Sequence, residues 1–353
     1  MNSRHLLFAA ASAVAALSLA ATGCSSPTTA TSSGSATSST TTSAAPSTSS
    51  SSAPTDKTYT IGVAVIVSHP SLQAVQDGFE AVLKENGVKY TLVSQNAQGD
   101  TANAATIASS FAANKNLDLI LAISTPIAQT MVAAEKTRPI IFSAVTDPIA
   151  AGLCPSWDQA GPNITGTSDL NPGAKPVSMV QEAMPSVKTI GVLYSSSEPN
   201  SLTQVTAYEA EAAALGVTIK KQAITQASEI STGLQALAGV DAMLVPTDNT
   251  VVAALPTVLA FGQEHKIPVF SADTNSVSQG AVAARGVSYT ALGRAAGQMA
   301  ISVLRDGVPV NTIKPVAPTD TELVVNPDAA KLFGLTLPDS FTKGATVVQT
   351  KAS

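Results

Sequence analysis

The sequence predicts an α/β protein made of two lobes, each built on a doubly wound parallel sheet. Two observations predict this fold class. From about Thr58 onward, apolar runs typical of buried strands alternate with segments of helical periodicity. In addition, three segments of the first half recur in the second half at offsets of 123 to 129 residues. A simpler explanation of this repeat is that buried strands resemble one another in composition.

The first half shows the alternation most clearly. Residues 59–67 form a nearly continuous apolar run rich in Ile and Val, which is typical of a strand covered on both faces. Apolar residues then follow at helical spacing from Leu72 to Leu83, and Gly87 ends this helix. Further strand and helix pairs are expected at 90–93 and 102–113, at 117–123 and 126–136, and at 139–142 with a turn at 143–148. Strands joined by helical crossovers imply a parallel sheet.

The second half repeats parts of the first in the same order. The matching segments are 61–63 with 190–192, 118–121 with 241–244, and 139–144 with 268–272. Two similar lobes that face each other across a cleft would explain this order.

The N-terminus predicts export and a lipid anchor. Arg4 and His5 precede an apolar stretch at 6–21 that is too short to span a bilayer, so residues 1–23 are expected to be a signal peptide. The small residues before Cys24 resemble a bacterial lipobox, which implies acylation of Cys24, for example with palmitate. The alternative is a plain secretory signal. Residues 24–57, nearly all Ser, Thr, Ala, Pro or Gly after Cys24, are expected to be a disordered linker on the extracytoplasmic face of the cell membrane.

Composition excludes several classes of partner. A net charge of -5 without a Lys or Arg cluster argues against nucleic acid. Two distant cysteines and His5, His69 and His265 offer no metal-ligand spacing, and we expect no metal or other cofactor. Cys154 is expected to be a small buried residue rather than a reactive thiol. We expect a monomer.

Candidate ligand-binding residues lie in the turns where the predicted strands end, because ligands of open α/β sheets gather at the carboxyl ends of strands. Each turn taken singly is more often a helix cap, since Ser, Thr, Asp and Asn are the usual N-caps. Together the turns converge on one cleft. The candidates are Ser68, His69, Ser124, Thr125, Ser143, Thr146, Asp147, Thr247, Asp248, Asn249 and Asp273.

These turns resemble a known family, the substrate-binding proteins of tryptophan/tyrosine-type ABC importers. The resemblance rests on residues 68–70, 95–100, 143–148, 163–168, 245–250, 271–274 and 292–294, and it covers about 58–338. It implies a type I periplasmic-binding fold that closes on a small solute, with an aromatic amino acid favoured, and delivers it to an ABC permease. The loop at 154–162, which contains Trp157, departs from the family pattern.

The resemblance also implies how the chain is divided. The N-terminal lobe would comprise 58–168 and 286–314, the C-terminal lobe 169–285 and 315–340, and a flexible tail 341–353. Hinge crossovers are expected near 166–172, 281–289 and 315–322. A helix at 289–304 would return to the first lobe, and a closing strand at 322–325 would join the second.

A zwitterionic ligand fits the polar turns. Ser124, Thr125, Ser143 and Thr146 could supply donors to a carboxylate at helix N-termini. An ammonium group requires a carboxylate, and Asp147, Asp248 and Asp273 are candidates, of which Asp248 and Asp273 are preferred because they would bring the second lobe onto the ligand. His69 could contact the ligand side chain or be an ordinary turn residue.

Three function classes remain to be weighed. A lipid-anchored solute-binding protein is preferred. A sensory co-receptor with the same fold cannot be separated from it by sequence. An exported hydrolase is disfavoured because no nucleophile elbow, phosphate loop or dinucleotide fingerprint is present, so we predict that the chain is not an enzyme.

Overall fold

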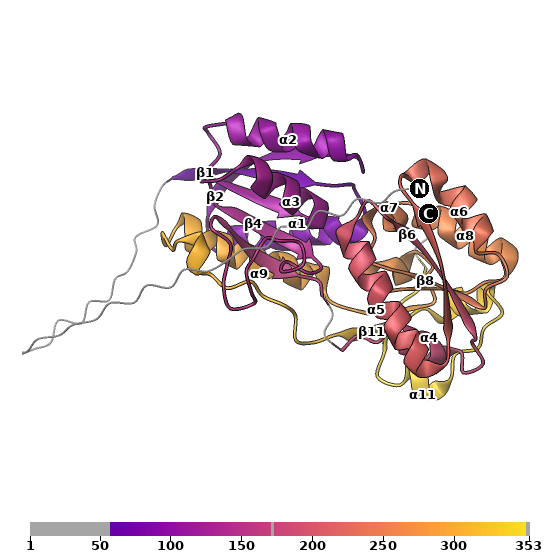
Figure 1. Ribbon diagram of the computed structural model, residues 1–353. Helices are drawn as coiled ribbons and strands as arrows, with labels where there is room; N and C mark the ends of the chain where they lie inside the picture. Colours follow the sequence, from indigo (N-terminus) through magenta and orange to yellow (C-terminus); the bar gives the residue numbers. More distant parts are fainter. Residues whose placement is uncertain (1–56, 171–172, 351–353) are drawn as a thin grey trace, which may run out of the picture. The chain divides into compact units, whose positions relative to one another are not determined.

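The computed structural model describes residues 57–170 and 173–350, which form two sheets with helices between the strands (Figure 1). We call each sheet with the helices packed on it a lobe. The predicted signal peptide, Cys24 and nearly all of the linker lie outside the described residues, as do the last three residues of the expected tail.

The first lobe contains five parallel strands in the order β2-β1-β3-β4-β5. The strands are β1 (Thr58–Val65), β2 (Lys89–Asn96), β3 (Leu119–Ile123), β4 (Ile140–Val145) and β5 (Ile164–Ser168). Its helices are α1 (Pro70–Glu85), α2 (Thr101–Ala113), α3 (Thr125–Ala134) and the later α9 (Tyr289–Leu304). This strand order reverses direction between β1 and β3, and such a switch point is where doubly wound sheets bind ligands.

The second lobe repeats that order as β7-β6-β8-β9-β10 and adds two strands, β11 and β12, at the β10 edge. The strands are β6 (Thr189–Ser195), β7 (Thr218–Ile224), β8 (Ala242–Val245), β9 (Val269–Ser271), β10 (Ala283–Gly286), β11 (Glu322–Val325) and β12 (Thr346–Val347). The helices are α4 (Pro176–Ala183), α5 (Pro199–Leu215), α6 (Ile230–Ala236), α7 (Asn249–Ala253), α8 (Leu255–His265), α10 (Pro327–Leu332) and α11 (Asp339–Thr342). Short 3-10 turns are η1 (Ala227–Glu229), η2 (Thr274–Gln279) and η3 (Val310–Thr312). The shared order of five strands supports the predicted repeat.

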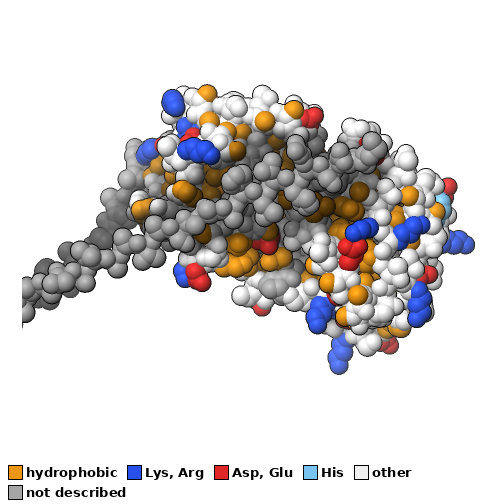
Figure 2. All heavy atoms as spheres, in the orientation of Figure 1, with side chains coloured by type: hydrophobic (Ala, Val, Ile, Leu, Met, Phe, Trp, Pro, Cys, Tyr) orange, Lys and Arg blue, Asp and Glu red, His pale blue; other side chains and the backbone are white. Residues whose placement is uncertain are grey.

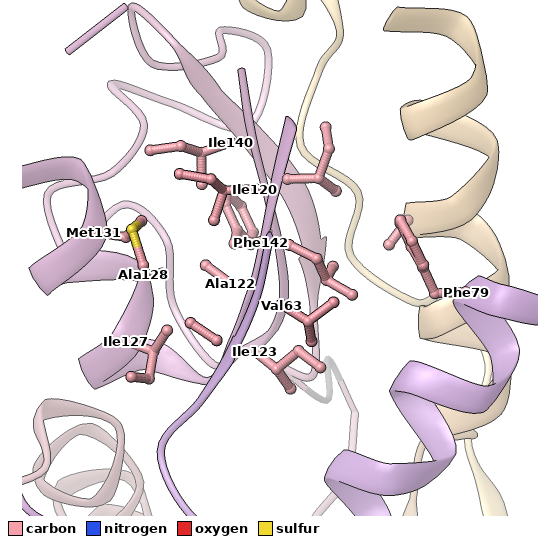
Figure 3. Packing of buried hydrophobic residues seen from close by; sticks show 14 of the residues in the cluster. Val63, Phe79, Ile120, Ala122, Ile123, Ile127, Ala128, Met131, Ile140 and Phe142 are labelled. Carbon is pink, nitrogen blue, oxygen red and sulfur yellow. The ribbon is translucent and has the colours of Figure 1, made fainter. Parts of the chain in front are cut away.

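Apolar side chains cover both faces of the first sheet. Figure 3 shows Phe79 of α1 on one side of the strands and Met131 of α3 on the other. Both side chains are fully buried, as are Ile120 and Phe142 of the strands between them. Burial on two faces explains why these strands read as continuous apolar runs rather than as alternating patterns.

Helix α9 lies against α1 of the first lobe, although it follows most of the second lobe in sequence (Figure 1). A Cβ placed on Gly293 would lie 1.9 Å from the backbone oxygen of Val75, so the two helices approach too closely for any larger residue at this position. Arg294 donates two hydrogen bonds to the carboxylate of Glu85, at 2.8 and 2.7 Å, on the exposed side of the contact. The helix predicted at 289–304 is confirmed.

The second sheet is parallel, as expected, except at one pair of strands. Strand β11 is antiparallel to β10, because the chain enters β11 after returning from the first lobe and not through a helical crossover on this sheet. One expectation about the C-terminus needs correction. Residues 341–350 are not a free tail. Phe341 is buried, and β12 pairs with β11. The exact lobe boundaries and hinges stay predictions.

In the described parts of the chain, no helix is both long and apolar enough to cross a membrane. Cys154 is a free cysteine that is buried, as expected, and burial raises the pKa of its thiol.

Candidate functional site

A small polar cavity, which we call the polar chamber, lies where strand ends of the two lobes meet. It is lined from the first lobe by His69, Leu72, Ala144, Thr146 and Tyr289, and from the second by Asn200, Thr247, Asn249, Val252 and Asp273; Asp169, which directly follows β5, completes the lining. Most of these residues follow the carboxyl ends of strands β1, β4, β5, β8 and β9. The chamber therefore occupies the position where α/β sheets bind ligands.

A second cavity of about 120 Å³, the apolar chamber, adjoins the first. The two share four lining residues, namely Thr146, Asp169, Thr247 and Tyr289. The rest of the apolar chamber comes mainly from the second lobe and includes Leu170, Ala174, Pro176, Thr203, Gln204, Ala207, Tyr208, Glu211, Ala272 and Val287. The site thus has a polar end and a larger, mostly apolar end.

Unsatisfied hydrogen-bonding atoms gather in the polar chamber. Among the described residues, five buried side-chain polar atoms lack a partner, and four of them belong to chamber residues: both ring nitrogens of His69, Oδ1 of Asp169 and Oδ1 of Asn200. The fifth is Oγ of Ser124. Because buried polar atoms are nearly always hydrogen-bonded, this cluster indicates a place prepared for a polar ligand.

Asp169 is the carboxylate at the centre of this cluster. It directly follows β5, and only 7% of its surface is exposed. Its Oδ2 accepts a hydrogen bond of 3.0 Å from the hydroxyl of Tyr289, while Oδ1 has no partner. Burial raises the pKa of Asp169, and the hydroxyls of Thr146 and Tyr289 oppose this shift. A cation at Oδ1 would favour the charged form.

Asn200 presents an acceptor from the second lobe. Its Nδ2 donates to Glu198 Oε2 at 3.2 Å and to the backbone oxygen of Thr247 at 3.0 Å. These donor contacts fix the orientation of the amide and leave its carbonyl oxygen unpaired. The residue is 4% exposed and lies at the start of α5.

Five of the residues proposed from the sequence line the polar chamber: His69, Thr146, Thr247, Asn249 and Asp273. Burial lowers the pKa of His69, partly offset by the charge of Asp273, so the ring favours its neutral form.

Asp248, one of the two preferred partners for an ammonium group, lines neither chamber. Its Oδ1 accepts from the backbone N–H of Val251 at 2.8 Å, and its Oδ2 accepts from the N–H of Ser195 at 2.5 Å and from Ser201 Oγ at 2.7 Å. Burial and the charge of Glu198 raise its pKa to about 7. Both oxygens are occupied, so Asp248 caps α7 and ties it to β6 instead of facing a ligand.

Asp273, the other preferred acid, connects the lobes. Its Oδ2 accepts hydrogen bonds from Ser71 Oγ at 2.6 Å and from Ser276 Oγ at 3.0 Å, and its Oδ1 accepts from the N–H of Asn275 at 2.9 Å. Asn275 Nδ2 also donates to Ser71 Oγ at 3.3 Å. We call Ser71, Asp273 and Asn275 the interlobe clasp. These contacts hold the lobes together at the site.

The remaining candidates line neither chamber and contact the protein itself. Asp147 caps the turn after β4 by accepting from the N–H groups of Ile149 and Ala150. Ser68 accepts from Asn96, Ser143 is bonded to Thr167, and Thr125 accepts from the N–H of Thr146. These hydrogen-bonded residues have structural roles at the strand ends. Ser124 is the exception, because its buried Oγ has no partner in the described part of the chain.

Two residues of the polar chamber, Asp169 and Asn200, are not among the candidates proposed from the sequence. Asp169 directly follows β5 and fits the strand-end rule, but it lies within an expected hinge. Asn200 carries no comparable signal, because an amide after a proline at a helix start is typical of ordinary caps. No group of three His, Cys, Asp or Glu in the described residues could hold a metal ion.

The chain matches the family model for the ABC transporter substrate binding protein over residues 60–349. It belongs to this family. A curated tyrosine-binding protein from Clostridioides difficile (strain R20291) is 39% identical over 284 residues, which cover 79% of this chain and 82% of that protein. Because the family and these relatives bind solutes, the protein is a binding protein and not an enzyme.

Two solved structures of similar identity differ in how well they superpose. A domain from Streptococcus pneumonia in complex with L-Trp is 37% identical and has a TM-score of 0.79. A ligand-free, open structure of a substrate-binding protein with adhesive properties from Clostridium difficile is 38% identical and has a TM-score of 0.61. Both matches cover 83% of this chain and 100% of the other. The structure therefore superposes better on the ligand-bound domain than on the ligand-free, open one.

Proposed function

We propose that this substrate-binding protein captures an aromatic amino acid in the two adjoining chambers. The observation that carries the proposal is the pairing of unpartnered acceptors at one end with an apolar lining at the other. The tyrosine named for one relative and the L-Trp bound by another support this ligand class.

The ammonium group of the ligand would bind Oδ1 of Asp169 and Oδ1 of Asn200. These are the acceptors that lack partners, and one belongs to each side of the site. An ammonium group has three donors and no acceptor, so two unpartnered acceptor atoms on residues that line the same chamber match it. Asp169 takes the role that the sequence suggested for Asp248.

The ligand carboxylate would bind neutral donors. The neutral ring of His69 carries one N–H in the polar chamber, where the side chain of Asn249 lies close enough to influence the pKa of the ring. The Oγ1 of Thr247 accepts from the side-chain amide of Gln204, so its own hydrogen is available to a ligand. The aromatic ring would then lie in the apolar chamber beside Tyr208, which is 4% exposed.

The protein would work outside the cytoplasm, anchored through acylated Cys24, and would deliver its ligand to an ABC permease as a monomer. The family match supports the permease, and the lipobox-like residues before Cys24 support the anchor. Replacing Cys24→Ser should move the protein from the membrane fraction to the medium or periplasm. Retention of the variant in the membrane would contradict acylation at this residue.

Calorimetric titration tests the ligand. Tyrosine, tryptophan or phenylalanine should bind, and leucine and glutamate should bind more weakly. In Asp169→Asn, we expect affinity for the aromatic ligand to fall by about 2 to 5 kcal/mol, the cost of removing one partner of a buried charge pair. Asp77→Asn removes an exposed carboxylate of α1 and is the matched control. Wild-type affinity in Asp169→Asn would refute the assigned contact, and binding of no aromatic amino acid would refute the proposed ligand.

A further inference from the structure

The two chambers contain acids but neither Lys nor Arg, and the ring of their histidine, His69, favours its neutral form. The acids of their combined lining are Asp169, Glu211 and Asp273. Lys and Arg side chains lie instead on the surface of the described residues, interspersed with acids on the face in Figure 2. The lining therefore favours positive charge and opposes negative charge.

The acids differ in how far the protein already satisfies them. Both oxygens of Asp273 accept hydrogen bonds in the clasp and its turn, and both oxygens of Glu211 accept from the first turn of α4, at Val177 and Ser178. Asp169 alone among the three has an oxygen with no partner. Asn200 adds a second unpartnered acceptor that is nine-tenths buried. The unmet requirement of these two oxygens is for a hydrogen-bond donor, and the charge of Asp169 favours a cationic one.

We propose that the ammonium group is sufficient for capture, so that the protein also binds arylalkylamines, which carry an aromatic ring and an ammonium group but no carboxylate. This inference rests on the proposed function in that the same chambers hold the ligand. It goes further because it separates the ammonium group of the amino acid from its carboxylate and assigns recognition to the ammonium group.

The carboxylate contributes less for a physical reason. The neutral donors offered to it, on His69 and Thr247, gain little once the cost of removing a carboxylate from water is included. It would also lie in a chamber that holds Asp169 and Asp273. Removing the carboxylate therefore loses modest hydrogen bonds and relieves like-charge repulsion. Removing the ammonium group leaves Asp169 and Asn200 unpaired and keeps the repulsion.

A ligand series that removes one charge at a time tests the proposal. The full-length protein is titrated calorimetrically with L-tryptophan, tryptamine and indole-3-propionate, and in parallel with L-tyrosine and tyramine. We expect tryptamine to bind within about tenfold of L-tryptophan. We expect indole-3-propionate to bind at least about 30-fold more weakly, because it leaves a buried carboxylate without its partner.

Variants connect the result to the chambers. Asp169→Asn should lower the affinity for tryptamine by at least about 30-fold, and it should leave the affinity for indole-3-propionate unchanged or raise it. Asp77→Asn should change none of these affinities. Binding of the amino acids without the amines would overturn this inference and leave the proposed function intact. Binding of the amines without the amino acids would overturn the proposed ligand and support the inference, and binding of neither class would overturn both. Tight binding of indole-3-propionate would also overturn the inference.

Discussion

The clasp predicts that a residue outside both chambers controls ligand affinity. Ser71 and Asp273 are each 1% exposed, and the 2.6 Å hydrogen bond between them joins α1 of the first lobe to the turn after β9 of the second. Ser71→Ala removes the donor and leaves the other hydrogen bonds of Asp273 in place. In an open protein, water would satisfy both groups, so the loss falls on the closed form.

The size of the effect follows from the charge of the acceptor. A hydrogen bond to a charged group contributes about 1.5 to 3 kcal/mol net. If the empty protein is mostly open, ligand binding should lose this same free energy, which raises Kd about 10-fold to 150-fold. Because Ser71 lines neither chamber, the factor should be equal for every ligand, unlike the loss in Asp169→Asn.

Calorimetry and small-angle scattering together measure this prediction. The variant should show a higher Kd while still reaching the compact wild-type radius of gyration at saturating ligand. Ser109→Ala, which removes a hydroxyl that donates to the backbone of Ala105 on the exposed side of α2, is the control. An unchanged Kd in Ser71→Ala, or a loss that differs from ligand to ligand, would refute the reasoning that the clasp stabilises closure.

Two further predictions concern pH and helix packing. Because burial raises the folded-state pKa of Asp169 above its ordinary value of 3.8, the stability it contributes is fully present below 3.8 and is lost as pH rises through the folded-state pKa. Calorimetric melting of the empty protein at a series of pH values should therefore show this loss of stability in wild type and not in Asp169→Asn. Over the same pH interval, the affinity of the wild type for the ammonium ligand should rise. Melting profiles that run parallel in the two proteins would contradict this prediction. Gly293→Ala should lower the free energy of unfolding, measured in urea titrations, by about 1 to 3 kcal/mol or more, because the added Cβ would meet the backbone of Val75. A variant as stable as the wild type would show that α9 can shift to make room.

Local periodicity made much of the fold predictable. The bounds of α9 match the helix expected at 289–304, and Leu292, Ala295, Met299 and Val303 recur along it at helical spacing. Strand β11 was also placed correctly. The antiparallel pairing of β11 and the docking of β12 depend on contacts between distant segments, which the periodicity of either segment does not contain.

The site was predictable only in part. Strand-end turns supply His69, Thr146 and Asp273 to the lining of the polar chamber. They could not separate Asp248, whose oxygens are occupied by three donors from its own lobe, from Asp169, whose Oδ1 has none. Both residues follow a buried strand in sequence. What distinguishes a cap from a ligand contact is the set of donors brought near by folding.

The return of α9 to the first lobe has a consequence for synthesis of the chain. Strand β1 and helix α1 emerge from the ribosome early, but the surface of α1 around Val75 and Gly78 stays uncovered until Leu304 has been made. By then five of the seven strands of the second sheet, β6 to β10, have also been made. The first lobe can therefore complete its packing only after most of the second lobe has been synthesised.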